Sequence, residues 1–81
     1  MSGALLDHDL IALLEDTSVK HFRTGESLLL RRGQIGTVVM VYADGALEVE
    51  FADREGRTYA LVSVSRDRVM LLRDAPDHAV A

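Results

Sequence analysis

The fold is decided by the stretch Ile35-Gly-Thr-Val-Val-Met-Val-Tyr42, which is rich in β-branched residues and ends on an aromatic one. Such side chains pack well on a pleated, half-buried surface, so the stretch predicts a β-strand. Gly33 relieves the tight start of this strand, and Gly36 inside it allows a close backbone approach or a bend. The neighbouring segments extend the β pattern toward the C-terminus.

After this strand, Ala43-Asp-Gly45 predicts a tight turn, because Gly tolerates positive φ and Asp can bond the local backbone. Residues 46–51 then alternate between apolar and acidic side chains, which predicts a half-buried strand. We expect its core-facing residues to be Leu47, Val49 and Phe51, and its water-facing residues to be Glu48 and Glu50. The series continues with a turn at 53–56, a strand at 58–64, a polar 3₁₀ link at 65–68 and a last strand at 69–72.

The secondary structure of the segments before Gly33 is less clear from the sequence. Residues 4–14 carry leucines at helical spacing, but residues 9–15 also fit a short buried strand, so periodicity leaves both structures open. The polar connection at 17–30 is expected to be partly mobile or to fold over one end of the domain, with residues 27–31 helical or extended. Counting a first strand, the chain predicts an all-β domain, a small five-stranded barrel at 1–73, followed by a flexible tail at 74–81.

Composition and charge exclude several classes of protein. The 81 residues make one domain, with 13 acidic against 9 basic residues and a net charge of −4, so the average field repels nucleic acid. No apolar segment is long enough to span a bilayer, and the N-terminus does not resemble a secretory leader, so no membrane association is expected. The absence of cysteine fits a reducing cytoplasm, where we expect the protein to be located.

No catalytic or metal site assembles from the sequence. His8 lies between Asp7 and Asp9, but no second cluster completes a metal shell. Glu48 and Glu50 are about 7 Å apart on one strand face. This arrangement fits the solvent-exposed face of an alternating strand better than the carboxylate pair of a glycosidase. We therefore expect a non-enzymatic protein with no catalytic residue, cofactor, metal or small-molecule substrate.

The apolar excess on two strands indicates a binding surface. By strict alternation, Val38, Met40 and Tyr42 share one strand face, and Tyr59 and Leu61 share another, yet neither strand has a fully polar side. The cover is either the connection at 17–30, a second copy of the chain or a foreign protein. The candidate partner-binding residues are Val38, Met40, Tyr42, Tyr59, Leu61, Arg54 and Arg57. The two arginines either join Arg31 and Arg32 in a basic patch or, as the alternating acids favour, belong to turns whose charge is neutralised.

The run from Arg32 to Tyr42 resembles the KOW motif, in which a glycine, a hydrophobe and a second glycine precede a β-branched strand. With Leu10–Asp16, 46–51, 56–61 and 69–72 in order, the chain is similar to the bacterial domain of unknown function 4926 family. The resemblance implies that residues 10–14 are a strand, that the fold is an SH3-like barrel, and that nucleic-acid binding is an alternative function. The long connection between strands 1 and 2, at 17–30, departs from the family, in which this connection is usually shorter. Some members are encoded beside toxin-like proteins, so an antitoxin, immunity or accessory role is also implied.

Overall fold

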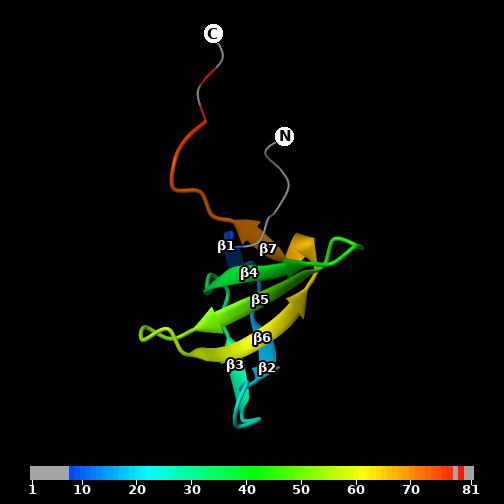
Figure 1. Cartoon of the computed structure of the whole chain (residues 1–81), viewed down its shortest axis with the longest axis vertical. Coiled ribbons are helices and arrows are strands. Elements are labelled where there is room, and N and C mark those ends of the chain that lie inside the picture. Colours follow the sequence, from blue (N-terminus) through cyan, green and yellow to red (C-terminus); the bar gives the residue numbers. More distant parts are fainter. Residues whose placement is uncertain (1–7, 78, 80–81) are drawn as a thin grey trace.

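The computed structural model describes residues 8–77 and 79 and shows an all-β protein (Figure 1). Five strands form one antiparallel sheet in the order β6-β5-β4-β1-β7, and β2 pairs with β3 alone. A 3₁₀ turn, η1 (Arg66–Arg68), leads into β7. The strands are β1 (Leu10–Leu13), β2 (Thr17–Lys20), β3 (Ser27–Leu30), β4 (Ile35–Val41), β5 (Leu47–Ala52), β6 (Thr58–Val64) and β7 (Val69–Leu71).

The all-β prediction is confirmed, whereas the prediction of a closed five-stranded barrel is wrong in two respects. The described residues contain seven strands, because the long connection is itself a pair of strands. The main sheet is also open: β6 and β7 are its two edges, and neither pairs with the other. The physical reason is that β7 has only three residues, so it offers a short edge for pairing with β6.

The connection at 17–30 is a β-hairpin, so residues 27–30 are extended and not helical. Its register runs from Thr17 opposite Leu30 to Lys20 opposite Ser27. At its closed end, the Nδ1 atom of His21 accepts hydrogen bonds from the backbone N–H groups of Arg23 at 3.0 Å and Thr24 at 3.3 Å. In Figure 1 the hairpin runs at a steep angle to the strands of the main sheet and extends beyond β6.

Residues 10–13 form a strand, β1, as the family resemblance implied, and not a helix. It pairs with β4 on one side and β7 on the other, so it is central to the sheet although leucine and alanine favour helices. Tertiary pairing therefore overrides local propensity here. Leu5 and Leu6, which contributed to the helical pattern, lie outside the described residues.

The core lies on one face of the main sheet and receives one residue from the hairpin. As expected from the alternation of β5, Leu47, Val49 and Phe51 are buried while Glu48 and Glu50 are not. The other residues of this cluster are Ile11, Leu13, Leu30, Val38, Ala60, Val64 and Val69. We call the opposite side of the main sheet the outer face.

Gly36 has the packing role that the sequence suggested. A Cβ atom at this position would lie 2.6 Å from Cγ1 of Val49 and 2.8 Å from Cε1 of Phe51. The backbone of β4 therefore rests directly on the Phe51 ring. Gly33, just before β4, has φ +92°, a conformation that favours glycine.

The described residues after β7 do not extend the sheet. Within residues 74–77 there is no strand or helix, and residues 78, 80 and 81 of the expected tail lie outside the described part. In the part of the chain that the structure describes, no helix is long and apolar enough to cross a membrane.

Candidate functional site

A β-bulge in β4 changes which of the predicted surface residues reach the outer face. Val38 lies opposite Val49, but Met40 lies opposite Glu48, so Val39 is an extra residue in the pairing. Val38, which comes before the bulge and lies on the same side as Gly36, is fully buried in the core. The prediction that Val38 shares an exposed face with Met40 and Tyr42 is wrong for Val38, because a one-residue insertion reverses the side on which the following residues point.

A second bulge separates Tyr59 from Leu61. Phe51 lies opposite Ala60 and Ala52 opposite Thr58, which leaves Tyr59 as the extra residue of β6. Tyr59 packs against the core, and its hydroxyl accepts a hydrogen bond from Nε2 of Gln34, whereas Leu61 is exposed on the outer face. Tyr59 therefore has a structural position, and Leu61 remains a surface residue.

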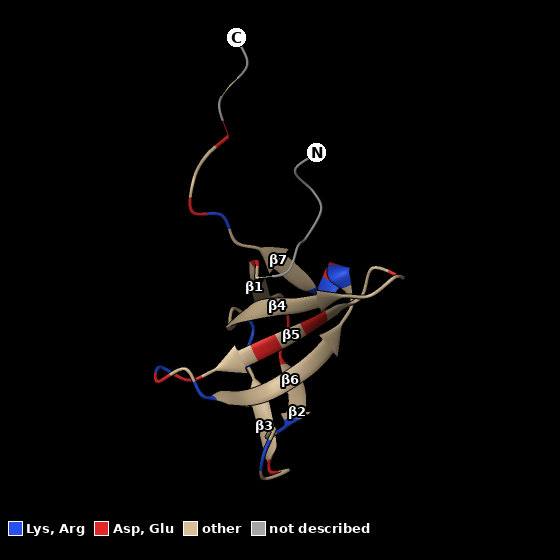
Figure 2. Ribbon diagram, in the orientation of Figure 1, with Lys and Arg blue, Asp and Glu red and all other residues tan. Residues whose placement is uncertain are grey.

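Glu48 and Glu50 form the centre of the outer face on the β4–β5–β6 side. Glu48 lies between Met40 of β4 and Ser63 of β6, and Glu50 lies between Thr37 and Leu61. Figure 2 shows these two positions as red bands on β5 between the uncharged strands β4 and β6. We call the group Met40, Tyr42, Glu48, Glu50 and Leu61 the glutamate patch.

Hydroxyl groups hold both carboxylates of the glutamate patch. Oε1 of Glu48 accepts hydrogen bonds from the hydroxyls of Tyr42 at 2.9 Å and Ser63 at 2.8 Å. Oε2 of Glu50 accepts one from the Thr58 hydroxyl. The bond to Glu48 raises the pKa of Tyr42 above its ordinary value of 10.0, because the phenol donates only while it keeps its proton. The carboxylates are thus fixed in orientation.

A second group of exposed apolar side chains lies across β1, β4 and β7. Ala12 is paired with Ile35 on one side and with Met70 on the other, so the three residues form a row across the sheet. Leu10 lies two residues before Ala12 on the same face. Leu10, Ile35 and Met70 are 48%, 57% and 51% exposed. We call these four residues the β1 patch.

The β1 patch was not among the predicted surface residues. In the sequence, Ile35 is the first of a run in which nearly every residue is apolar, so alternation does not tell which side is exposed. In the structure Gly36 faces the core, where its missing side chain lets Phe51 approach, so Ile35 faces away. Only the identity of the ring partner, which the sequence does not give, makes that inference possible.

The arginines do not gather into one basic surface. Arg57 pairs with Asp53 at 3.2 Å and Glu55 at 3.3 Å, as neutralised turns would require. Arg31 pairs with Asp16 at 3.5 Å and Arg68 with Glu15 at 3.4 Å. Arg54 is exposed in the same β5–β6 turn as Arg57, away from the β1 patch.

Asp53 organises that turn, and its charge should stabilise the fold. Its carboxylate accepts backbone N–H groups of Arg57 at 2.9 Å and Glu55 at 3.0 Å. These bonds, with the Arg57 guanidinium, lower the pKa of Asp53 below its ordinary value of 3.8.

We expect Asp53→Asn to lower the urea midpoint near neutral pH. The difference between the midpoints of the wild type and the variant should become smaller in acid. A carboxyl whose pKa is lower when folded stabilises the protein fully above its unfolded pKa, and this stabilisation is lost as the pH falls below 3.8 and through the folded value. The measurement compares urea midpoints of the two proteins from pH 7 to pH 2. A difference that stays constant across this range would show that the charge contributes nothing.

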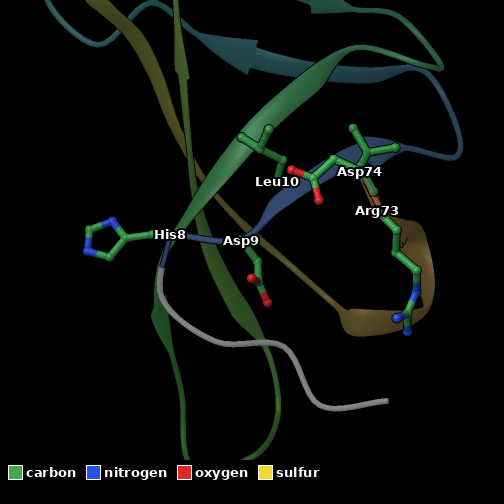
Figure 3. A pocket seen from close by; sticks show the side chains of 6 residues that line it. His8, Asp9, Leu10, Arg73 and Asp74 are labelled. Atoms are coloured by element: carbon green, nitrogen blue, oxygen red, sulfur yellow. The ribbon is translucent and has the colours of Figure 1, made fainter. Parts of the chain in front are cut away.

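A shallow pocket lies where β1 begins and β7 ends. Its volume is about 340 Å³, and it is lined by His8, Asp9, Leu10, Leu72, Arg73 and Asp74. In Figure 3 the imidazole of His8 points away from the other labelled side chains, so His8 and Asp9 do not converge on a common ligand position in this pocket. Asp7, the third residue of the sequence cluster, lies outside the described residues. Across residues 8–77 no group of three histidine, aspartate or glutamate side chains is placed to hold a metal ion.

Comparison with known proteins identifies the family. The family described as Domain of unknown function (DUF4926) has a model that matches residues 7–71. The chain belongs to this family. No curated protein and no solved structure was found to match it. The match covers β1 to β7, so the β1 patch and the glutamate patch both lie within the DUF4926 domain.

Proposed function

We propose that this DUF4926 domain is a non-enzymatic protein-interaction module whose partner covers the outer face of the main sheet. One observation carries the proposal: six large apolar side chains on that face are between 37% and 57% exposed. They are Leu10, Ile35, Met40, Tyr42, Leu61 and Met70. Several large apolar side chains exposed on one face of a small domain are typical of a protein-binding site.

The hairpin supports this proposal because it leaves the outer face uncovered. Of its three leucines, Leu30 enters the core, Leu28 is half-buried and Leu29 is 53% exposed. The residues of the hairpin that touch the core cluster, Leu30 and Val19, join the inner side of the sheet. Of the three covers considered for the apolar surface, the chain's own hairpin is therefore the least favoured.

The fold within this proposal is an SH3-like, KOW-type barrel left open between β6 and β7. Its support is the strand order of the main sheet, the insertion between its first two strands in sequence, and the 3₁₀ turn before its last strand. Such a scaffold hosts many functions, so the binding proposal rests on the outer face and not on the fold.

The cellular role that we propose is that of a bacterial cytoplasmic accessory partner, such as an antitoxin or immunity protein for a neighbouring gene product. Nucleic-acid binding is less well supported. Arg31, Arg57 and Arg68 each pair with a carboxylate, and the net charge of −4 opposes approach to phosphate.

The β1 patch provides a test of the proposed function. We expect the double variant Ile35→Thr, Met70→Gln to remain folded, because exposed substitutions usually change stability by less than about 0.5 kcal/mol each. The same variant should lose a partner that co-elutes with the wild-type chain expressed at native level in its own organism. The matched control is Leu29→Thr, which removes an equally exposed apolar side chain from the hairpin.

Two results would contradict the proposal. One is a wild-type chain that elutes as a monomer with no companion protein at native expression. The other is a companion that the double variant retains as strongly as the wild type does, with the Leu29→Thr chain behaving identically.

A further inference from the structure

The glutamate patch defines the chemistry of the partner more narrowly than its exposed apolar side chains alone. Glu48 and Glu50 occupy neighbouring outward positions of β5, about 7 Å apart. In the described part of the chain, every ion pair involves other carboxylates, so neither glutamate is neutralised by a lysine or arginine. Both are half-buried at the middle of an otherwise uncharged strand group.

Each carboxylate keeps one oxygen available. The Tyr42 and Ser63 hydroxyls bind the same atom of Glu48, Oε1, and the Thr58 hydroxyl binds Oε2 of Glu50. Oε2 of Glu48 and Oε1 of Glu50 accept no hydrogen bond from the described residues. A partner can therefore donate to either carboxylate without disturbing the bonds that orient it.

Apolar side chains flank the two charges on opposite sides. Met40 neighbours Glu48 on the β4 side, and Leu61 neighbours Glu50 on the β6 side. They are 44% and 41% exposed. A purely apolar partner would bury Met40 and Leu61 only by stripping water from two uncompensated carboxylates, which costs several kcal/mol per ion. A partner with a cation between apolar side chains would compensate that cost and bury both residues.

We propose, resting on the proposed function, that the glutamate patch binds a protein segment in which an arginine or lysine is flanked by apolar side chains. The cation donates to the available oxygens of Glu48 and Glu50, and the flanking side chains cover Met40 and Leu61. Arginine suits this position best, because its planar guanidinium carries five N–H donors and can donate to the available oxygens of two carboxylates at once.

The experiment begins with a library of random 12-residue peptides selected against the whole chain. Enriched peptides should contain an arginine or lysine next to apolar residues, and their affinities are then measured by fluorescence anisotropy. Glu50→Gln should weaken binding at least about tenfold, because the partner's cation loses a hydrogen bond to a charged group. Gln keeps an acceptor oxygen for the Thr58 hydroxyl, so the fold is expected to persist. Glu26→Gln, the same change of charge in the hairpin, is the control and should leave the affinity unchanged.

A double-mutant cycle shows whether the cation and Glu50 meet. Replacing the peptide arginine by citrulline should weaken binding to the wild type about tenfold but should weaken binding to Glu50→Gln clearly less, because only Glu48 then remains to accept from the cation. If the free-energy effects of the citrulline and Glu50→Gln substitutions are additive, the inferred contact between the cation and Glu50 is wrong.

Each remaining outcome also bears on one of the two proposals. Enriched peptides without basic residues, or peptides that bind Glu50→Gln as well as wild type, would overturn the partner chemistry while leaving the interaction module intact. Enrichment of no peptide, together with a monomeric chain that lacks a native companion, would overturn both.

Discussion

Gly36→Ala is expected to lower the free energy of unfolding by about 3 kcal/mol, at the upper end for an overpacked core. The new Cβ atom would lie 2.6 Å from Cγ1 of Val49 and 2.8 Å from the Phe51 ring, and neither is the end of a flexible side chain. Both partners are fully buried, so neither can move without displacing others. Urea unfolding at 25 °C measures the change.

The control for Gly36→Ala is Gly25→Ala in the hairpin turn. Gly25 has φ +75° and nothing within 4 Å of its added Cβ, so the substitution costs only the left-handed backbone, about 1–2 kcal/mol. Combining Gly36→Ala with Val49→Ala should give less destabilisation than the sum of the single changes, because the nearest contact disappears. Additivity of the two substitutions would show that the close contact is not the cause.

The strands from β4 to β7 could be predicted because each has a local pattern. Residues 58–64 are the clearest case, since the predicted strand has the bounds of β6. In β5 the alternation of acidic and apolar residues fixed both the strand and its buried side. The prediction of a 3₁₀ turn before β7 is also confirmed, because Ser65-Arg-Asp-Arg68 is polar and too short for a longer helix.

The candidate surface could be predicted only in part, because it depends on two bulges. In β4 the residues around Val39 are apolar on both sides, so no polar side chain reveals where the alternation is interrupted. Met40, Tyr42 and Leu61 are on the outer face as a group, but Val38 and Tyr59 are not. A bulge exists only relative to a partner strand, so the sequence of one strand does not contain it.

The hairpin was predicted least well, because its stability depends on contacts made elsewhere. An isolated two-stranded hairpin is marginal in water. Here Phe22 donates its N–H to the carbonyl of Tyr59 at 2.6 Å, and Leu30 enters the core. Neither contact is visible in the polar composition of residues 15–26, which suggested a mobile connection.

Leu30→Ala is therefore expected to lower the free energy of unfolding by about 3 kcal/mol, as deletion of a buried leucine side chain usually does. Leu30 is only 2% exposed and belongs to the same cluster as Phe51 and Val38. Because a small domain has a total stability of roughly 5–15 kcal/mol, this single change removes a large share of it. Urea denaturation followed by circular dichroism measures the loss.

The matched control is the preceding residue, Leu29, which has the same side chain but is 53% exposed. Leu29→Ala should change stability by less than about 0.5 kcal/mol, because its side chain makes no core contact. If the two substitutions destabilise the chain equally, the hairpin is not anchored through Leu30. A large difference between neighbouring leucines would instead show that residues 17–30 fold with the sheet. In that case the hairpin stabilises the core on the inner side of the sheet.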